Sequence, residues 1–322
     1  MKIVAVDLGG THARFAIAEL HGDRRPTLSA PRRYRTAEHA GLAAAWAAFA
    51  RDEGHALPRL ASIAIAGPVE GDLIRFTNNS WVIRPATLGR ELGLDDLCLF
   101  NDFAAMASAV AVMLPKELAY LGGPEGALPA EGVTTVIGPG TGLGVAQLLR
   151  RQGRNIVIAT EGGHIDFAPL DGFEEKLLGR LRDRHRRVSV ERVVSGPALA
   201  DIRATLASTD GEAIVPLDDA ALWQAATDGS DPLAAQALDR LVMTLGAVSG
   251  DLALAHGAHS VVITGGLANR IQPRLTGPLF NDRFRAKGRF ERRMSDLPIR
   301  LARHAEAGLL GAAAAFQEER RA

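Results

Sequence analysis

The amino-acid sequence predicts an α/β protein with two domains of related plan. Short apolar runs rich in β-branched residues alternate with helical segments along 322 residues, which is enough chain for two sizeable cores. The order strand, glycine turn with a threonine, strand, turn, strand occurs at the N-terminus and again from residue 134. Because ligands gather where strands end in such folds, we expect each domain to offer a glycine turn to a shared cleft.

The first half of the chain predicts a short series of strands interrupted by one helix. Leu42, Trp46 and Phe49 are spaced to bury one helix face, and Thr36 is a candidate N-cap for that helix. The expected elements are strands over 2–7, 14–20 and around Tyr34, with a turn over 21–26 between the last two; a helix over 36–54; strands over 60–66, on both sides of the turn at 70–72, and over 97–100; and a helix from Phe103.

The second half predicts the same order of elements again. The expected elements are strands over 134–137, 145–149 and 155–159, a turn over 151–154, a loop over 210–219, a helix over 232–257, a strand over 260–264, and an Ala-rich helix after Leu309 with a solvated end over 317–321.

Composition excludes several classes of function. Lys and Arg together number 37, as do Asp and Glu, so the net charge is zero and gives no general attraction to nucleic acid or an anionic membrane. The single cysteine, Cys98, rules out an internal disulfide and favours a reducing compartment. It lies in an apolar strand, where a buried thiol is expected rather than a nucleophile. Without a signal-peptide pattern or a membrane-spanning apolar run, we expect a cytoplasmic protein.

Three glycine turns follow buried strands and together predict a phosphate site. They are 9–11, 138–142 and 265–266, and two of them carry a threonine. One such turn alone indicates only a tight turn, but three favour backbone N–H groups that approach an anion. Neither a P-loop lysine nor a dinucleotide fingerprint accompanies them. The nucleotide-binding candidates are Asp7, Gly9, Gly10, Thr11, Arg14, Gly138, Gly140, Thr141, Gly142, Gly265 and Gly266, with Asp7 placed to hold a metal ion or its water shell.

Asn101 and Asp102 end another strand, where ligands collect in α/β folds. The Asp102 carboxylate can take the proton of an attacking hydroxyl as a phosphoryl group arrives. It can equally cap the helix that starts at Phe103. The residues alone leave both interpretations open. Asn101 is expected to bind hydroxyls with both ends of its amide.

The separated motifs resemble the bacterial ATP-dependent glucokinase family, hexokinase-type enzymes of the actin-like ATPase superfamily. The likeness runs from Val4 to about Leu310. It includes the glycine turns, the pair Asn101–Asp102, and the segments 161–167, 190–197, 288–290 and 308–311. The resemblance implies two ribonuclease H-like domains flanking a cleft. We place the small domain at 1–108 together with a C-terminal helix at about 305–322, and the large domain at 109–304.

The resemblance also implies a reaction, in which the γ-phosphoryl group of MgATP passes to the 6-hydroxyl of glucose at the entry to glycolysis. Asp102 is then the base, Asp7 holds Mg²⁺ through water, and the protein is a homodimer. The implied sugar contacts are Asn78, Asn101, Asp102, Glu161, His164 and Glu191.

Each of these sugar contacts also has a simpler explanation. Glu161 reads as a solvated loop residue, His164 as structural and Glu191 as a charge on a helix face, while Asn78 and Asn79 suit an Asx turn. Two departures from the family pattern, His12 and Pro139, leave local contacts open.

The function also has alternatives. They are a kinase for another hexose or amino sugar, a sugar-sensing regulator, and an actin-like ATPase. The regulator needs a DNA-binding domain ahead of a strand that already begins at residue 2. ADP and polyphosphate stay open as donors.

Overall fold

The computed structural model describes residues 1–22, 24–67, 69–76 and 79–321, and these form two compact units. The N-terminal unit comprises Met1–Leu114, Leu148–Ala159 and His304–Ala322, and the second unit comprises Pro115–Gln147 and Thr160–Arg303. The sequence predicts domain boundaries at residues 108 and 304. It assigned 148–159 to the large domain, whereas this segment clusters with the N-terminal unit. Asn78, a predicted sugar contact, lies outside the described residues.

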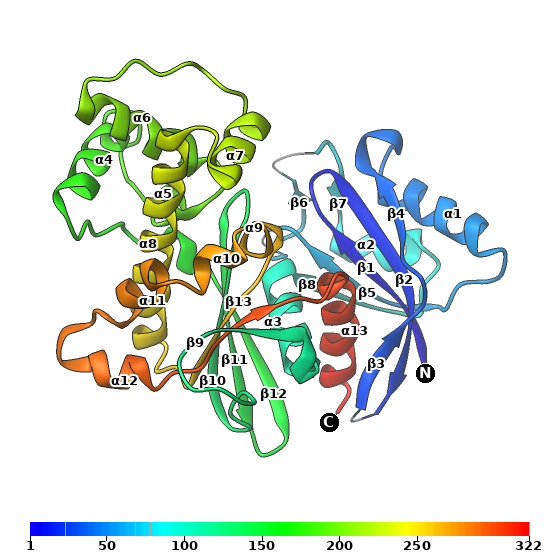
Figure 1. Cartoon of the computed structure of the whole chain (residues 1–322). Coiled ribbons are helices and arrows are strands. Elements are labelled where there is room, and N and C mark those ends of the chain that lie inside the picture. Colours follow the sequence, from blue (N-terminus) through cyan, green and yellow to red (C-terminus); the bar gives the residue numbers. More distant parts are fainter. Residues whose placement is uncertain (23, 68, 77–78, 322) are drawn as a thin grey trace. The chain divides into compact units, whose positions relative to one another are not determined.

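The N-terminal unit is built on a mixed sheet of order β3-β2-β1-β5-β8, with β4 also paired to β2 (Figure 1). β1, β5 and β8 are parallel, and β1 and β2 are antiparallel. The elements are β1 (Lys2–Leu8), β2 (His12–His21), β3 (Arg24–Leu28), β4 (Arg32–Arg35), α1 (Leu42–Glu53), β5 (Leu60–Ile65), β6 (Ile74–Arg75), β7 (Val82–Ile83), α2 (Pro85–Glu91), β8 (Asp96–Asn101), α3 (Asp102–Val112) and α13 (Ala307–Glu319).

Three local predictions for this unit were wrong. The expected turn over 21–26 contains the start of β3, which tolerates Pro26 because β3 is an edge strand that needs no further backbone donor. Thr36 does not cap the helix. It starts a 3₁₀ turn, and α1 begins after Gly41. β6 and β7 both follow the turn at 70–72 and pair with each other, so they do not flank it.

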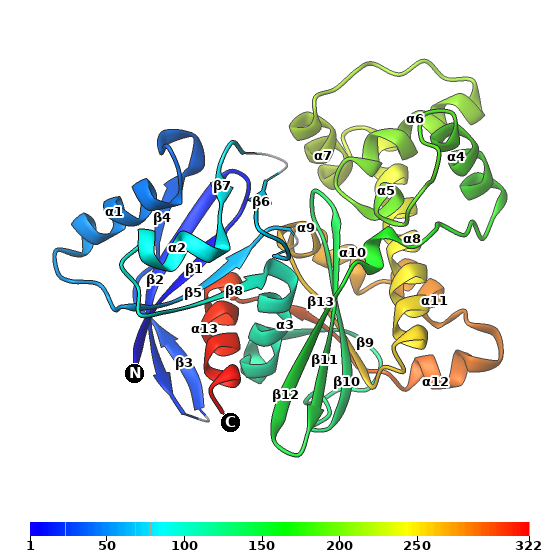
Figure 2. The same ribbon diagram turned by 180° about the vertical axis from the view of Figure 1, so that it is seen from behind.

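Both faces of this sheet are buried, which explains the continuous apolar run of β1. Val4, Val6 and Leu8 pack with Phe15 and α1, while Ile3 and Ala5 pack with α3 and α13. Small residues let α3 and α13 approach closely, since a Cβ at Gly311 would lie 1.8 Å from the Ala105 carbonyl oxygen. Figure 2 shows these two helices side by side along the sheet.

The C-terminal end of α13 packs against the rest of the N-terminal unit. The predicted solvated end over 317–321 is confirmed for Glu319 and Arg320, which are exposed, but not for Gln317, which is buried. The buried Gln317 side chain accepts the His21 N–H at 3.1 Å and donates to the Arg24 carbonyl at 2.8 Å. Glu318 accepts the Asn155 N–H at 3.3 Å. The last turn of the helix thereby holds both the β2–β3 hairpin and the segment 148–159.

The second sheet has the order β12-β11-β10-β13-β14-β9, in which β10, β13 and β14 are parallel. The expected strands at 134–137, 145–149, 155–159 and 260–264 and the helix over 232–257 are confirmed within a few residues. α8 buries one face in its first half and is buried on all sides over 244–250. The elements are β9 (Leu118–Gly122), β10 (Gly132–Pro139), β11 (Leu143–Arg151), β12 (Arg154–Thr160), α4 (Gly172–Arg182), α5 (Glu191–Val194), α6 (Ala198–Asp210), α7 (Asp219–Asp228), α8 (Pro232–Ala255), β13 (Ser260–Ile263), α9 (Gly266–Arg270), α10 (Gln272–Leu275), α11 (Pro278–Arg285), α12 (Glu291–Ser295) and β14 (Ile299–Ala302).

Candidate active site

The N-terminal unit gathers its predicted site residues at one edge of the sheet. Leu8, Ile65 and Asn101 are in register at the carboxyl ends of the parallel strands β1, β5 and β8. Neighbouring strands lie about 4.8 Å apart, so the first glycine turn and the pair Asn101–Asp102 are separated by roughly two strand spacings, about 10 Å. This edge is where α/β folds place ligands.

In the first glycine turn the carbonyl groups are hydrogen-bonded within the protein, whereas two N–H groups are left for a ligand. The Gly10 carbonyl accepts the Thr36 hydroxyl at 2.8 Å, and the Thr11 carbonyl accepts the Thr36 N–H at 3.0 Å. The Gly9 carbonyl accepts Asn79 Nδ2 at 3.4 Å. Within the described part of the chain, the N–H groups of Gly10 and Thr11 have no acceptor. Such a turn suits an anion.

Asp7 lies beneath this turn, held by Arg14, its antiparallel partner in register. Arg14 Nη1 donates to Asp7 Oδ2 at 2.8 Å, and the Asp7 side chain is 19% exposed. Burial raises the pKa of Asp7 above its ordinary value of 3.8, although the charge and hydrogen bond of Arg14 act in the opposite direction. α13 comes close from the other end of the chain: a Cβ on Gly308 would lie 2.5 Å from the Asp7 carboxylate.

Asn101, and not Asp102, is the N-cap of α3. Its Oδ1 accepts the N–H groups of Phe103 and Ala104, and its Nδ2 donates to the Gly67 carbonyl at 3.0 Å. One amide hydrogen therefore remains for a ligand, so the expectation that both amide ends bind hydroxyls was wrong. Asp102 is the first residue of α3, where its Oδ1 accepts the Phe103 N–H at 2.9 Å.

In the second unit, the second and third glycine turns lie together at the carboxyl edge of its sheet. Ile137 and Ile263 are in register on parallel strands, and the turns follow directly. Gly265 has a φ of +96° and faces the Pro139 carbonyl, where an added Cβ would be 3.2 Å away. Glycine is needed there for its conformation. At Gly140 the space around a Cβ is open, which leaves room for a ligand.

A cavity of about 390 Å³ opens beside these two turns. Thr141 and Gly266 line it from the turns, and the side chains of Asp219, Trp223 and Arg270 line it from α7 and α9. The Arg270 guanidinium lies 5.9 Å from the centre of the Trp223 ring. Trp223 Nε1 donates to the Gly196 carbonyl at 3.3 Å, which fixes the ring.

The predicted sugar contacts of the second unit meet around Leu143, just after the second turn. Glu191 Oε2 accepts the Leu143 N–H at 2.9 Å, and a Cβ on Gly163 would lie 2.1 Å from the Leu143 carbonyl oxygen. Glu161 and His164 flank Gly163, with His164 Nε2 at 3.9 Å from Glu161 Oε2 and both side chains exposed. The structure thus brings together Glu161, His164 and Glu191.

The two motifs that carry these residues are tied by backbone hydrogen bonds. The Val190 N–H donates to the Ile165 carbonyl at 2.9 Å, and Phe167 N–H to Val188 at 3.0 Å. Gly196 N–H donates to the Gly140 carbonyl at 2.7 Å, so the second motif also touches the second glycine turn. Sugar and phosphate motifs distant in sequence therefore form one surface.

Sequence reasoning missed several residues of these surfaces. Trp223, Asp219 and Arg270 carry no motif, and Gly308 belongs to a quoted segment without an assigned role. For Asn79, the alternative of an Asx turn is confirmed, since its Oδ1 accepts the Trp81 N–H at 2.8 Å. Among the described residues, no group of three or more His, Cys, Asp or Glu side chains forms a metal site. Nor does any described helix have the length and apolarity to cross a membrane.

Comparisons with known proteins agree on one family. The glucokinase family model matches residues 4–319. The chain is 55% identical to the glucokinase of Zymomonas mobilis over 98% of both chains, and 39% identical to that of Caulobacter vibrioides over 98% of this chain and 95% of the relative. A crystal structure of glucokinase from an Antarctic psychrotroph matches with a TM-score of 0.86 and 31% identity, covering 98% of each chain.

More distant structures share the fold. A ROK family glucokinase from Streptomyces griseus, solved with glucose and AMPPNP, matches with a TM-score of 0.61 and 22% identity, over 97% of this chain and 98% of that one. The predicted fold class, that of the actin-like sugar kinases, is confirmed by these neighbours. The chain that carries the glycine turns, the Asn101–Asp102 pair and the surface around Leu143 therefore belongs to the glucokinase family.

Proposed function

We propose that this glucokinase-family enzyme transfers the γ-phosphoryl group of MgATP to the 6-hydroxyl of glucose. The observation that carries the proposal is the surface around Leu143, where Glu161, His164 and Glu191 meet beside the second glycine turn. An ATPase without a sugar substrate has no need of these side chains. The relatives named glucokinase, at 55% and 39% identity, support glucose as the sugar.

Asp102 is the proposed general base. The O6 oxygen of glucose attacks the γ-phosphorus, the bond from that phosphorus to the β–γ bridging oxygen breaks, and ADP leaves with the electron pair. The O6 proton passes to the Asp102 carboxylate. The bond from Phe103 N–H to Asp102 Oδ1 at 2.9 Å fixes the orientation of that carboxylate at the start of α3.

The glycine turns supply the phosphate contacts in this proposal. The unbonded N–H groups of Gly10 and Thr11 and the hydroxyls of Thr11 and Thr141 are donors for phosphate oxygens. Pro139 has no N–H, and the Gly140 N–H already donates to the Gly142 carbonyl at 2.8 Å, so the donors of the second turn are those of Thr141 and Gly142.

Asp7 suits an outer-sphere role toward Mg²⁺. Magnesium keeps several waters and binds through phosphates and one or two carboxylates. Asp7 Oδ2 is bonded to Arg14, while Oδ1 has no partner among the described residues and can accept from a metal-bound water. When bound, Mg²⁺ neutralises charge that develops on the phosphates.

The sugar contacts follow from the hydrogen bonds that remain available. The Oε2 atom of Glu191 already accepts the Leu143 N–H, so its Oε1 atom is the one that can accept a hydrogen bond from a sugar hydroxyl. Glu161 can accept from two vicinal hydroxyls, and His164 donates or accepts according to its tautomer. Asn101 contributes the one amide hydrogen that its capping role leaves.

The cavity of about 390 Å³ suits the adenosine part of ATP. Its Trp223 ring and Arg270 guanidinium offer stacking surfaces, and the Asp219 carboxylate can accept from ribose hydroxyls. The cavity begins at Gly140 and Thr141, so a nucleotide there would direct its phosphates to the second turn.

A panel of sugars and donors on the purified protein tests the proposal. We expect rapid ADP formation with glucose and MgATP, slower turnover with mannose, fructose and glucosamine, and little with ADP or polyphosphate as donor. ATP hydrolysis without sugar should be much slower than the reaction with glucose. Preference for another hexose would contradict glucose as substrate, and sugar-independent hydrolysis at the same rate would contradict a kinase.

The homodimer and the cytoplasmic location are proposed from the family resemblance and from composition. Light scattering on the purified chain at micromolar concentration tests the first, with twice the mass of 34.1 kDa as the expected result. Cell fractionation tests the second.

A further inference from the structure

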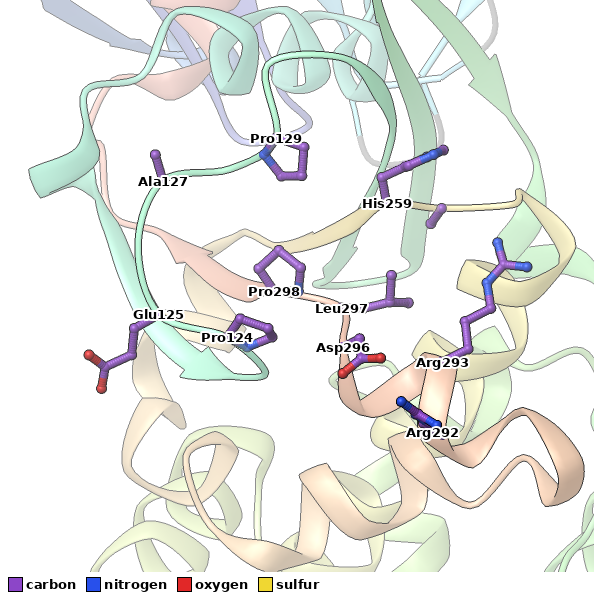
Figure 3. A pocket seen from close by; sticks show the side chains of 11 residues that line it. Pro124, Glu125, Ala127, Pro129, His259, Arg292, Arg293, Asp296, Leu297 and Pro298 are labelled. Atoms are coloured by element: carbon purple, nitrogen blue, oxygen red, sulfur yellow. The ribbon is translucent and has the colours of Figure 1, made fainter.

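A cavity of about 720 Å³ lies in the second unit, at the edge of the sheet opposite the glycine turns (Figure 3). Its lining includes Ala258 and His259, which precede β13, and Leu297 and Pro298, which precede β14. The third glycine turn instead follows β13. At about 3.3 Å per residue, the six residue steps from His259 to Gly265 correspond to roughly 20 Å. The cavity is therefore distinct from the nucleotide and sugar surfaces.

Two arginines in this cavity have no acidic partner among the described residues. Arg292 and Arg293 lie on α12 with exposed side chains, and neither forms an ion pair with any described residue. Two basic residues earlier in the segment are paired with acids: Arg285 bonds Asp282, and Lys287 bonds Asp251 at 2.8 Å. Figure 3 shows the two side chains pointing in different directions, Arg293 toward His259 and Arg292 beside Asp296, so their guanidinium groups can donate to two separate phosphate or carboxylate groups of one ligand.

A third group is held in place at the rim. His259 N–H donates to the Val133 carbonyl at 2.7 Å, and its Nδ1 accepts the Val133 N–H at 3.2 Å. Since Nδ1 is the acceptor, the ring hydrogen lies on Nε2. That hydrogen has no acceptor within the described ranges of the chain. His259 thus adds a fixed donor to the two arginines.

A buried charge fixes the opposite wall. Arg300 is 3% exposed and donates to the carbonyls of Pro124 at 2.7 Å and Gly126 at 2.9 Å. Burying a guanidinium costs desolvation free energy unless it is hydrogen-bonded. Here its hydrogen bonds to the two carbonyls offset that cost and hold in place a loop without secondary structure. The wall is therefore preformed, as binding sites generally are.

The rest of the lining is largely apolar, with Pro124, Pro129, Leu297 and Pro298 among its residues. The Glu125 carboxylate points away from the other labelled side chains in Figure 3. Asp296 is the acidic group beside the arginines. We propose that this cavity is a second ligand site, which binds a small organic anion through Arg292, Arg293 and His259 and covers its carbon skeleton with the proline-rich wall.

Calorimetry with the full chain tests this site. The probes are phosphoenolpyruvate, citrate and inorganic phosphate, titrated into protein already saturated with glucose and AMPPNP so that the proposed active site is filled. They distinguish a phosphate-bearing from a carboxylate-bearing ligand. We expect phosphoenolpyruvate or citrate to bind with a Kd below about 1 mM, and more tightly than inorganic phosphate.

Variants identify where the probe binds. Arg292→Ala with Arg293→Ala should weaken binding at least about tenfold. Arg289→Ala is the matched control, because Arg289 belongs to the same basic segment but lies over the Phe290 ring, outside the cavity lining. It should bind as wild type. Asp296→Asn removes a repulsive charge and should tighten binding about threefold. All four substitutions are at exposed positions, so turnover with glucose should be unchanged.

The outcomes are decisive. Binding that the double variant weakens and the control does not supports the site. No binding of either organic anion, equal binding of inorganic phosphate, or binding that survives in the double variant would overturn it.

Discussion

Gly308→Ala should disable the magnesium side of the active site while leaving the sugar side intact. The added Cβ would lie 2.5 Å from Asp7 Cγ and Oδ2 and 2.9 Å from Oδ1. Ordinary contacts of a Cβ begin at 3.4 Å, so the carboxylate must move by about 3.4 − 2.5 = 0.9 Å. Arg14 holds that carboxylate at 2.8 Å, and a shift of this size breaks or bends the ion pair.

The effect on turnover should exceed the effect on stability. Overpacking costs about 1–3 kcal/mol, and replacing a helical glycine with alanine returns up to about 1 kcal/mol, so the net loss of stability is roughly 0–3 kcal/mol. A displacement near 1 Å at a catalytic group lowers turnover about 100-fold, which is about 2.7 kcal/mol in activation free energy.

The assay is coupled ADP production at varied Mg²⁺ and MgATP, together with calorimetric glucose binding. We expect kcat to fall about 100-fold and the Mg²⁺ requirement to rise, with the Kd for glucose within about twofold of wild type because Asp7 is not a sugar contact.

Two controls separate this effect from general damage. Gly89→Ala lies in α2 with open space around the new Cβ, and should keep full activity with a small gain in stability. Gly311→Ala is on the same helix as Gly308 but meets the Ala105 backbone, so it should lower stability without changing turnover per folded molecule. Wild-type turnover and Mg²⁺ dependence in Gly308→Ala would refute the role given to Asp7.

Two further predictions concern titratable groups. Burial raises the pKa of Glu318, but hydrogen bonds from Asn155 and Arg321 outweigh it and hold the folded pKa below the ordinary 4.5, so the stabilisation is present above that value and is lost as the pH falls through the folded pKa. Glu318→Gln should therefore be about 1–2 kcal/mol less stable in urea unfolding at neutral pH, with a difference that disappears in acid; a constant difference would contradict this. Burial raises the pKa of Cys98 to about 11, so iodoacetamide should label the native thiol far more slowly at neutral pH than the unfolded one, as mass spectrometry would show, and equal rates would contradict the assignment.

Local patterns predicted much of the fold. The apolar runs gave the parallel strands β1, β5 and β10, since burial on both faces requires a continuous hydrophobic stretch. Elements fixed by tertiary packing escaped prediction. β3 is polar and contains Pro26, and only its position at the sheet edge makes it a strand.

The same distinction applies to the site. The glycine turns and Asn101–Asp102 are local motifs at strand ends, so sequence reasoning found them. Gly308 approaches Asp7 across about 300 residues, and no local pattern records that contact. Trp223 also lacks a motif, since its place beside the second turn depends on how α7 packs. Two candidate caps were wrong: Asn101 rather than Asp102 caps α3, because adjacent polar residues were both able to do so, and Thr36 starts a separate 3₁₀ turn ahead of α1.

The turnover of Asp102→Asn is the most direct test of Asp102 as the general base. Asparagine keeps the shape of the side chain and its place at the start of α3 but cannot accept the O6 proton, a change that costs about 10²–10⁴ in rate. We expect that loss in the coupled assay with MgATP and glucose, with glucose binding by calorimetry within about threefold of wild type. Turnover within about twofold of wild type would contradict Asp102 as the base.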